Sequence, residues 1–265
     1  MMNTILTHKI WGAGAGDPVL LMNGGLMTFL SWGPVAAGLE GAHRVIGFDF
    51  RGMLKSPGTP PPVIDGHVDD VVALLDYLGV AHVHAVGTSF GAEVGVLLAA
   101  KHPARVRSLA LITATERIDA DLWRAAQPLR EACRVAARGA DGGVVFDILM
   151  RGTFSPAYLE AQAEAIAVRR QQIAAMPRAW FEGLDVLLGS LHNVDLRPVL
   201  GLITCPTLVV GAELDLTFPP GHSRALAAGI PGARLEIVKG SGHGLVAEQP
   251  ERVLELLEPF FPVSS

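Results

Sequence analysis

A serine between two glycines occupies the point where a predicted strand turns into a predicted helix. Residues 87–91 read Gly-Thr-Ser-Phe-Gly, after an apolar run from His82 to Thr88 and before a run of small apolar residues from Phe90 to Lys101. A serine on such a turn stands clear of the sheet at the amino end of a helix, where N–H groups and the helix dipole favour a developing negative charge. The turn requires positions without side chains on both sides. The pattern predicts that Ser89 is a nucleophile.

A serine nucleophile needs a base, and His243 is the best placed of the nine histidines. It lies in residues 240–244, Gly-Ser-Gly-His-Gly, in a loop after the last predicted strand. The flanking glycines allow the imidazole to be presented without a competing side chain. His82 and His84 alternate on a predicted strand, but no nearby carboxylate or cysteine completes a set of metal ligands. The sequence therefore predicts His243 as the base and no metal site.

Two carboxylates are candidates for the acid that orients the histidine and stabilises its imidazolium form. Both lie in residues 212–220, a loop that follows a predicted strand. Asp215 lies further into this loop and is the predicted partner of His243, and Glu213 is the alternative.

Short apolar runs and longer helical patterns alternate along the chain. Near-continuous apolarity is typical of strands that are buried on both faces of a sheet. The predicted strands are Val19 to Met22, Arg44 to Phe50, His82 to Thr88, Ser108 to Thr113, Thr207 to Gly211 and Arg234 to Val238. The predicted helices between them include Asp65 to Leu78 and Phe90 to Lys101. The alternation predicts an α/β fold, with a mostly parallel central sheet and helices on both faces. The glycine-rich run 12–16 precedes a strand and predicts a hairpin turn.

Only helical periodicity occurs from Thr115 to Pro198. A run of helices inserted between two parallel strands is expected to lie over the carboxyl edge of the sheet, where open α/β sheets bind their ligands. We therefore predict one core formed by residues 1–114 and 199–265, with residues 115–198 as a helical cap. The alternative is a second helical domain with no role in binding.

Composition narrows the possible partners. Half of the 265 residues are hydrophobic and 18% are charged, which indicates a folded globular chain. The formal net charge of −5 argues against nucleic acid binding. No apolar run is long enough to predict a membrane-spanning helix. With no secretory signal, Cys133 and Cys205 are expected to be reduced and the protein cytoplasmic. Monomer and homodimer both remain open.

Further short motifs agree with this order of residues. Residues 49–52, Asp-Phe-Arg-Gly, resemble the D-x-R-G turn that follows the second parallel strand of the α/β-hydrolase superfamily, and residues 242–243 resemble its terminal Gly-His. The order serine, acid, histidine is also that of this superfamily, and differs from that of chymotrypsin and subtilisin. From about Val19 to its end the chain resembles the compact bacterial 3-oxoadipate enol-lactonases, related esterases and antibiotic-pathway methylesterases. This resemblance implies the α/β-hydrolase fold and the triad Ser89, Asp215 and His243.

The chain departs from the usual superfamily pattern in two loops. Residues 23–26 read Asn-Gly-Gly-Leu where most members have His-Gly, and Leu54 replaces the second glycine of R-G-x-G-x-S. The second change affects the expected conformation of its loop rather than the triad. In the arrangement that the resemblance implies, the backbone N–H groups of Phe90 and Gly25 form the oxyanion hole.

Side chains that contact the substrate are expected from the loop at residues 23–26 and from the predicted cap. The candidates are Asn23, Leu26, Phe146, Met150, Trp180 and Phe181. For the apolar candidates from the cap, simple core packing is the alternative.

The predicted function is a metal-free serine hydrolase, without a cofactor, of a small to medium carboxylic ester or lactone. The same scaffold also supports carbon–carbon bond hydrolysis, perhydrolysis or cofactor-free oxygenation. A receptor that binds a small molecule without turning it over is a non-catalytic alternative.

Overall fold

The computed structural model describes residues 5–261, so that both ends of the predicted core, residues 1–4 and 262–265, lie outside the described part. Its centre is a seven-stranded sheet in the order β1-β3-β2-β4-β5-β6-β7. The strands are β1 (His8–Trp11), β2 (Gly16–Met22), β3 (His43–Phe48), β4 (Val83–Thr88), β5 (Val106–Ile112), β6 (Thr207–Ala212) and β7 (Arg234–Val238). All pairs are parallel except that of β1 with β3. The six predicted strands and the α/β fold are therefore confirmed.

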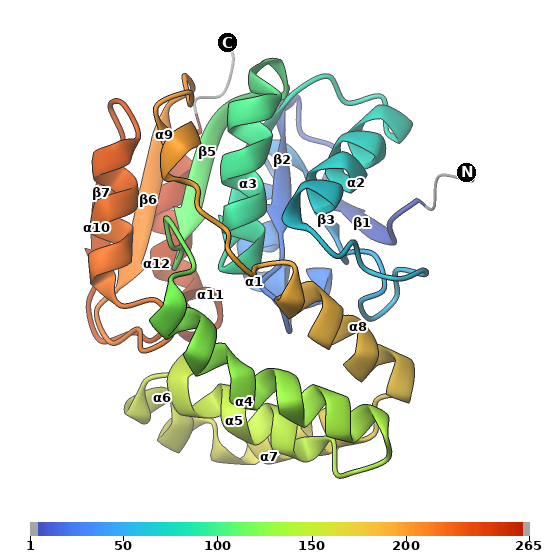
Figure 1. Ribbon diagram of the computed structural model, residues 1–265. Helices are drawn as coiled ribbons and strands as arrows, with labels where there is room; N and C mark the ends of the chain where they lie inside the picture. Colours follow the sequence, from blue (N-terminus) through green and yellow to red (C-terminus); the bar gives the residue numbers. More distant parts are fainter. Residues whose placement is uncertain (1–4, 262–265) are drawn as a thin grey trace.

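Helices cover both faces of this sheet (Figure 1). Their bounds are α1 (Gly33–Leu39), α2 (Ile64–Tyr77), α3 (Phe90–Lys101), α4 (Ala120–Ala137), α5 (Gly143–Thr153), α6 (Pro156–Ala161), α7 (Ala163–Ala174), α8 (Arg178–Gly189), α9 (Arg197–Leu200), α10 (Pro220–Gly229), α11 (Leu245–Glu248) and α12 (Pro250–Leu257), with short 3-10 turns at Phe29–Trp32, Pro103–Arg105 and Glu258–Phe260.

The alternation of side chains along β2 shows how the two faces are divided. Leu20 and Met22 belong to a core cluster shared with α2, α3 and α10, whereas Val19 and Leu21 belong to one shared with α1, α11 and α12. Strands covered on both faces must be apolar at every position, which explains the continuous apolar runs in the sequence.

The strand β1 was not predicted, and the predicted hairpin turn at residues 12–16 is wrong. Strand β3 lies between β1 and β2, so the glycine run connects two strands that are not neighbours. The run instead passes close to the backbone before β3. A Cβ atom on Gly12 would lie 2.3 Å from the Glu40 carbonyl oxygen, and one on Gly14 would lie 2.3 Å from the Ala42 carbonyl. Gly12 and Gly14 therefore have to be glycines, because the backbone of residues 40–42 leaves no space for a side chain at either position.

The helices α4 to α8 lie together across one end of the sheet, at the bottom of Figure 1. We refer to residues 115–198 as the helical segment. Its two connections to the sheet run side by side: Ile118 N–H donates to the Val194 carbonyl at 2.8 Å, and Leu196 N–H donates to the Glu116 carbonyl at 2.9 Å. Its buried apolar side chains belong to the same cluster as those of α2 and α3. The helical segment and the core thus share one continuous cluster of buried apolar side chains.

Candidate active site

The turn between β4 and α3 holds Ser89 in a conformation that few side chains adopt. Its φ is 50° and its ψ is −128°, and its side chain is partly exposed. A Cβ atom on Gly87 would lie 2.3 Å from the Gly91 carbonyl oxygen, and one on Gly91 would lie 2.3 Å from the Met22 carbonyl oxygen. A side chain at Gly87 would therefore clash with the first turn of α3, and one at Gly91 would clash with the end of β2. The sequence reasoning that both positions must lack bulk is supported by these contacts.

A continuous chain of hydrogen bonds joins three of the predicted site residues. His243 Nε2 lies 2.9 Å from Ser89 Oγ, and His243 Nδ1 lies 2.8 Å from Asp215 Oδ2. Asp215 is 2% exposed and His243 is 9% exposed. The structure thus brings together residues that are up to 154 positions apart in the sequence.

The loop after β6 separates the two candidate acids. The second oxygen of Asp215 accepts hydrogen bonds from the N–H groups of Thr217 and Phe218, both at 2.8 Å. These bonds fix the orientation of the carboxylate, so that its other oxygen, Oδ2, is directed towards His243. Glu213 is exposed and instead accepts a hydrogen bond from Gly240 N–H at 2.9 Å. Only Asp215 contacts the imidazole among these two acids.

The loop at residues 23–26 lies directly beside the serine. A Cβ atom on Gly24 would be 3.5 Å from the Cβ of Ser89 and 3.6 Å from the Thr88 carbonyl oxygen, so this loop lies close to the turn that carries the serine. Phe90 is the first residue of α3, and the first four N–H groups of a helix have no acceptor within it. The N–H of Phe90 therefore has no acceptor within α3, and it lies close to the loop that carries Gly25.

Asn23 lies beneath this loop with its side chain occupied by internal hydrogen bonds. It is 1% exposed, its amide nitrogen donates to the Phe48 carbonyl at 2.7 Å, and its amide oxygen accepts from Trp32 Nε1 at 2.9 Å. The geometry favours a role in holding the loop, because the polar atoms of Asn23 already have partners within the protein. Leu26 is partly buried against the main core cluster.

Asp49 connects the loop at residues 23–26 to the one that contains Leu54. Its carboxylate accepts from Phe29 N–H at 2.9 Å and from Asn23 Nδ2 at 3.2 Å, and burial raises its pKa. Leu54 has a φ of 47°, the left-handed region that glycine adopts without strain. The leucine at this departure from the superfamily pattern therefore has a backbone conformation that is strained for a residue with a side chain and that glycine would adopt freely.

The apolar candidates from the helical segment are buried. Phe146, Trp180 and Phe181 are 6%, 3% and 2% exposed, and Met150 is partly buried against the same cluster. The ring of Phe181 packs on Gly142, where a Cβ atom would be 2.2 Å from its Cζ. The structure therefore places the ring of Phe181 against the connection between α4 and α5.

Two leucines of α8 that the sequence reasoning missed lie over the loop instead. The Cδ2 atoms of Leu187 and Leu188 would be 3.7 and 3.8 Å from a Cβ atom on Gly25. Both continue the apolar spacing of Phe181 and Leu184 along the helix, and this periodicity is the signal that could have found them.

A buried acid lies one turn after Ser89 on α3. Glu93 is 0% exposed, accepts a hydrogen bond from Thr115 N–H at 3.0 Å, and has no partner for its second oxygen among the described residues. Burial raises the pKa of this carboxyl group to about 8. Glu93 is thus protonated at neutral pH and adds no negative charge behind the serine.

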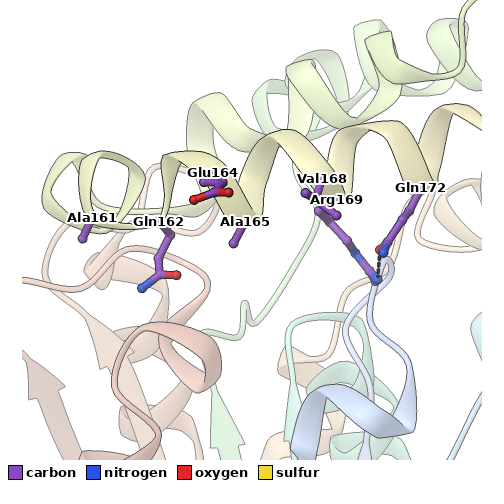
Figure 2. A pocket seen from close by; sticks show the side chains of 7 residues that line it. All are labelled: Ala161, Gln162, Glu164, Ala165, Val168, Arg169 and Gln172. Carbon is purple, nitrogen blue, oxygen red and sulfur yellow. Dashed lines mark hydrogen bonds between the residues drawn. The ribbon is translucent and has the colours of Figure 1, made fainter.

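A separate hollow of about 500 Å³ lies on the surface of the helical segment (Figure 2). It is lined by Ala161, Gln162, Glu164, Ala165, Val168, Arg169 and Gln172. None of the predicted site residues lines it. Within residues 5–261, no group of three or more His, Cys, Asp or Glu side chains is arranged to hold a metal ion, and no helix is long and apolar enough to cross a membrane.

Comparison with known proteins identifies the family. Residues 17–250 match the alpha/beta hydrolase fold family. A relative from Caulobacter sp. strain K31, a putative carbamate hydrolase RutD, is 30% identical, over 93% of this chain and 91% of its own. The enol-lactonase from Burkholderia xenovorans LB400 is 27% identical and superposes with a TM-score of 0.85 over 96% of this chain and 95% of its own. The MGS-M2 alpha/beta hydrolase from a Medee basin deep-sea metagenome library has the same fold, with a TM-score of 0.90, 22% identity, and coverage of 98% and 95% of the two chains. The chain therefore belongs to the alpha/beta hydrolase fold family.

Proposed function

We propose that this protein is a serine hydrolase of small to medium carboxylic acyl compounds. The observation that carries this proposal is the chain of hydrogen bonds from Asp215 through His243 to Ser89, with distances of 2.8 and 2.9 Å. Ser89 Oγ attacks the acyl carbon while His243 Nε2 accepts its proton, and the imidazolium then protonates the leaving group. Water activated by the same imidazole releases the acyl group from the serine. Asp215 fixes the tautomer of His243 and stabilises its charged form.

The negative charge of the tetrahedral intermediate needs donors that are already in place. We assign this role to the N–H groups of Phe90 and Gly25, because the amino end of α3 and the loop at residues 23–26 meet at Ser89. Preorganised donors of this kind stabilise an oxyanion by several kcal/mol without reorganising during the reaction. The buried hydrogen bonds of Asn23 and Asp49 support the loop from below.

The helical segment is the proposed cap over this site. Leu187 and Leu188 lie beside Gly25, so their side chains lie next to any acyl group that binds in the proposed oxyanion hole. Apolar side chains at this position exclude water and select the substrate by shape. The substrate is proposed to be a small molecule.

An ester or lactone is the substrate class that we propose, in agreement with the enol-lactonase to which the fold is similar. A carbamate is the second candidate, because the relative at 30% identity over more than nine-tenths of both chains is a putative carbamate hydrolase. Both classes present a carbonyl to the serine, and they differ in whether nitrogen is attached to it.

A substrate panel tests the proposed function. Purified protein and a Ser89→Ala variant are assayed against matched esters, lactones and carbamates with the same acyl size, with product measured by chromatography. We expect turnover of at least one class by the wild type and none above background by the variant. Equal turnover by the two proteins would contradict the assignment of Ser89, and turnover of carbamates alone would replace the ester assignment.

A further inference from the structure

The two glycines beside His243 pack against residues 153–155, the connection between α5 and α6 in the helical segment. Gly244 N–H donates to the Thr153 carbonyl at 2.7 Å. A Cβ atom on Gly242 would be 2.8 Å from that same carbonyl oxygen, and one on Gly244 would be 2.3 Å from the ring of Phe154. Neither glycine has a positive φ. Residues 153–155 therefore approach the backbone at both glycines too closely to leave room for a side chain.

The carboxylate of Glu248 joins the same two stretches from the other side. Its Oε1 accepts from Gly242 N–H at 2.9 Å and from Ser155 N–H at 3.0 Å, and its Oε2 accepts from Ser155 Oγ at 2.5 Å. Ser155 is 3% exposed and caps α6 through Tyr158 N–H. One side chain at the end of α11 thus connects the residue before His243 to the first turn of α6.

The acid loop contacts the same part of the helical segment. Thr217 Oγ1 donates to the Gly152 carbonyl at 3.2 Å, while Thr217 N–H donates to Asp215. Residues 152–155 therefore contact the loop of Asp215 and the loop of His243 together. Because a misplacement of about 1 Å can cost on the order of 10²-fold in rate, these contacts bear directly on the position of the imidazole.

We propose that Glu248 is a positioning residue for His243, which it holds within reach of Ser89 by fastening the His243 loop to residues 153–155 of the helical segment. The inference rests on the proposed function, in which His243 is the base. It gives the helical segment a second role besides covering the site, because residues 152–155 of the segment support the loops of Asp215 and His243. Glu248 touches neither substrate nor reacting atoms in this account.

Three substitutions separate the position of the carboxylate from its charge. Glu248→Gln keeps the length of the side chain: its amide oxygen can accept from Gly242 N–H and Ser155 N–H, and its NH₂ group can donate to Ser155 Oγ. Glu248→Asp keeps the charge but is shorter by about 1.5 Å, so it cannot span both partners. Glu248→Ala removes both. Glu251→Ala, at an exposed carboxylate three residues further on, is the matched control.

The experiment measures kcat and KM for p-nitrophenyl acetate, together with the downfield ¹H resonance of the proton shared by His243 Nδ1 and Asp215. The resonance is assigned by its absence in a His243→Gln variant. We expect kcat to fall about 10²-fold in the alanine and aspartate variants of Glu248, with KM nearly unchanged and the resonance broadened or lost. Glu248→Gln and Glu251→Ala should stay within about tenfold of the wild type and keep the resonance.

Two results would overturn the proposal. One is an aspartate variant that stays active while the glutamine variant loses activity, which would show that the charge matters and the position does not. The other is a sharp resonance and full kcat in both the alanine and the aspartate variants. If the alanine variant does not fold, the comparison of aspartate with glutamine still decides. Failure of the proposed function is seen separately, as equal activity of the wild type and Ser89→Ala, whereas the resonance reports on His243 without any turnover.

Discussion

The two halves of the proposed active site are positioned in different ways. Ser89 is held by five consecutive residues, with a strand before it, a helix after it and a glycine on each side. His243 is held directly by Asp215 and indirectly through its two neighbours, because Gly244 N–H donates to the Thr153 carbonyl and Gly242 N–H donates to Glu248. The nucleophile therefore depends on local backbone geometry, and the base depends on the packing of distant segments. Changes near the serine should act on the reaction directly, and changes around the histidine should act through its position.

The largest effect is expected on the nucleophile side. Ser89→Ala should lower kcat by about 10⁴-fold or more, equivalent to ~5 kcal/mol of transition-state stabilisation, because the attacking atom is lost. The fold should survive, since a single partly exposed hydroxyl is removed. Steady-state kinetics and thermal unfolding measure the two quantities, and a variant with a tenth of the wild-type kcat on the true substrate would refute the assignment.

The acid on the base side should have the next largest effect. Asp215→Asn should reduce kcat by about 10⁴-fold, because the amide favours the wrong tautomer of His243 and does not stabilise its charge. Glu213→Gln should reduce kcat by less than about tenfold, because its amide oxygen can still accept from Gly240 N–H. Kinetics of the matched pair check this, and the opposite order would give the acid role to Glu213.

The division between the halves explains how much of the site the sequence could predict. Ser89, its two glycines and the positions of the six parallel strands along the chain follow from local patterns, and the structure confirms the predicted fold. The packing of Gly242 and Gly244 against residues 153–155, and the bonds of Glu248, join parts of the chain about 90 residues apart. No local pattern contains such a contact. The sequence therefore singled out the glycines around His243 but could not show that residues 153–155 pack against them.

Strand β1 shows a similar limit. Its four residues are partly or largely exposed, so they lack the apolar run that marked the other strands.

The side chains that contact the substrate were hard to predict because the helical segment has too many apolar candidates rather than too few. Every helix of a packed segment carries an apolar face, so Phe181 and Leu187 look alike in the sequence although only Leu187 lies beside Gly25.

The leucines over the proposed oxyanion loop should tune selectivity without abolishing the reaction. Leu187→Ala or Leu188→Ala should change kcat/KM unequally for small and large acyl groups, by about tenfold to two hundredfold, because each methylene of fit contributes ~1 to 3 kcal/mol. Phe181→Ala is the control, since its ring packs on Gly142. Assays with a series of acyl lengths measure the change. Equal factors for all lengths would favour a helical segment with no role in selection.

The smallest effect on catalysis is expected from the buried acid behind the nucleophile, whose predicted effect is on the pH dependence of stability. Glu93 has a pKa of about 8 in the folded protein and an ordinary value of 4.5. Between these values the unfolded chain loses a proton that the folded protein keeps. The stability contributed by this residue is therefore fully present below pH 4.5 and is lost as the pH rises to about 8, by at most ~1.4 kcal/mol per pH unit.

The glutamine of a Glu93→Gln variant cannot ionise. The free energy of unfolding of this variant should therefore increase relative to that of the wild type as the pH rises from 4.5 to about 8. Urea unfolding at several pH values between 5 and 9 measures the difference. The cost of burying the amide is the same at every pH. It therefore does not affect the comparison, which uses only the slope of the free energy of unfolding against pH. Parallel curves for the two proteins would show that the carboxyl group is already charged in the folded state.

Covalent labelling tests the central assignment of nucleophile and base most directly. The wild type is treated with a small fluorophosphonate, and the adduct is located by mass spectrometry of its peptides. We predict one phosphonyl group per chain, on Ser89, with no adduct in Ser89→Ala and a labelling rate that falls strongly in His243→Gln. An adduct on another residue, or an equal labelling rate without the histidine, would contradict the account.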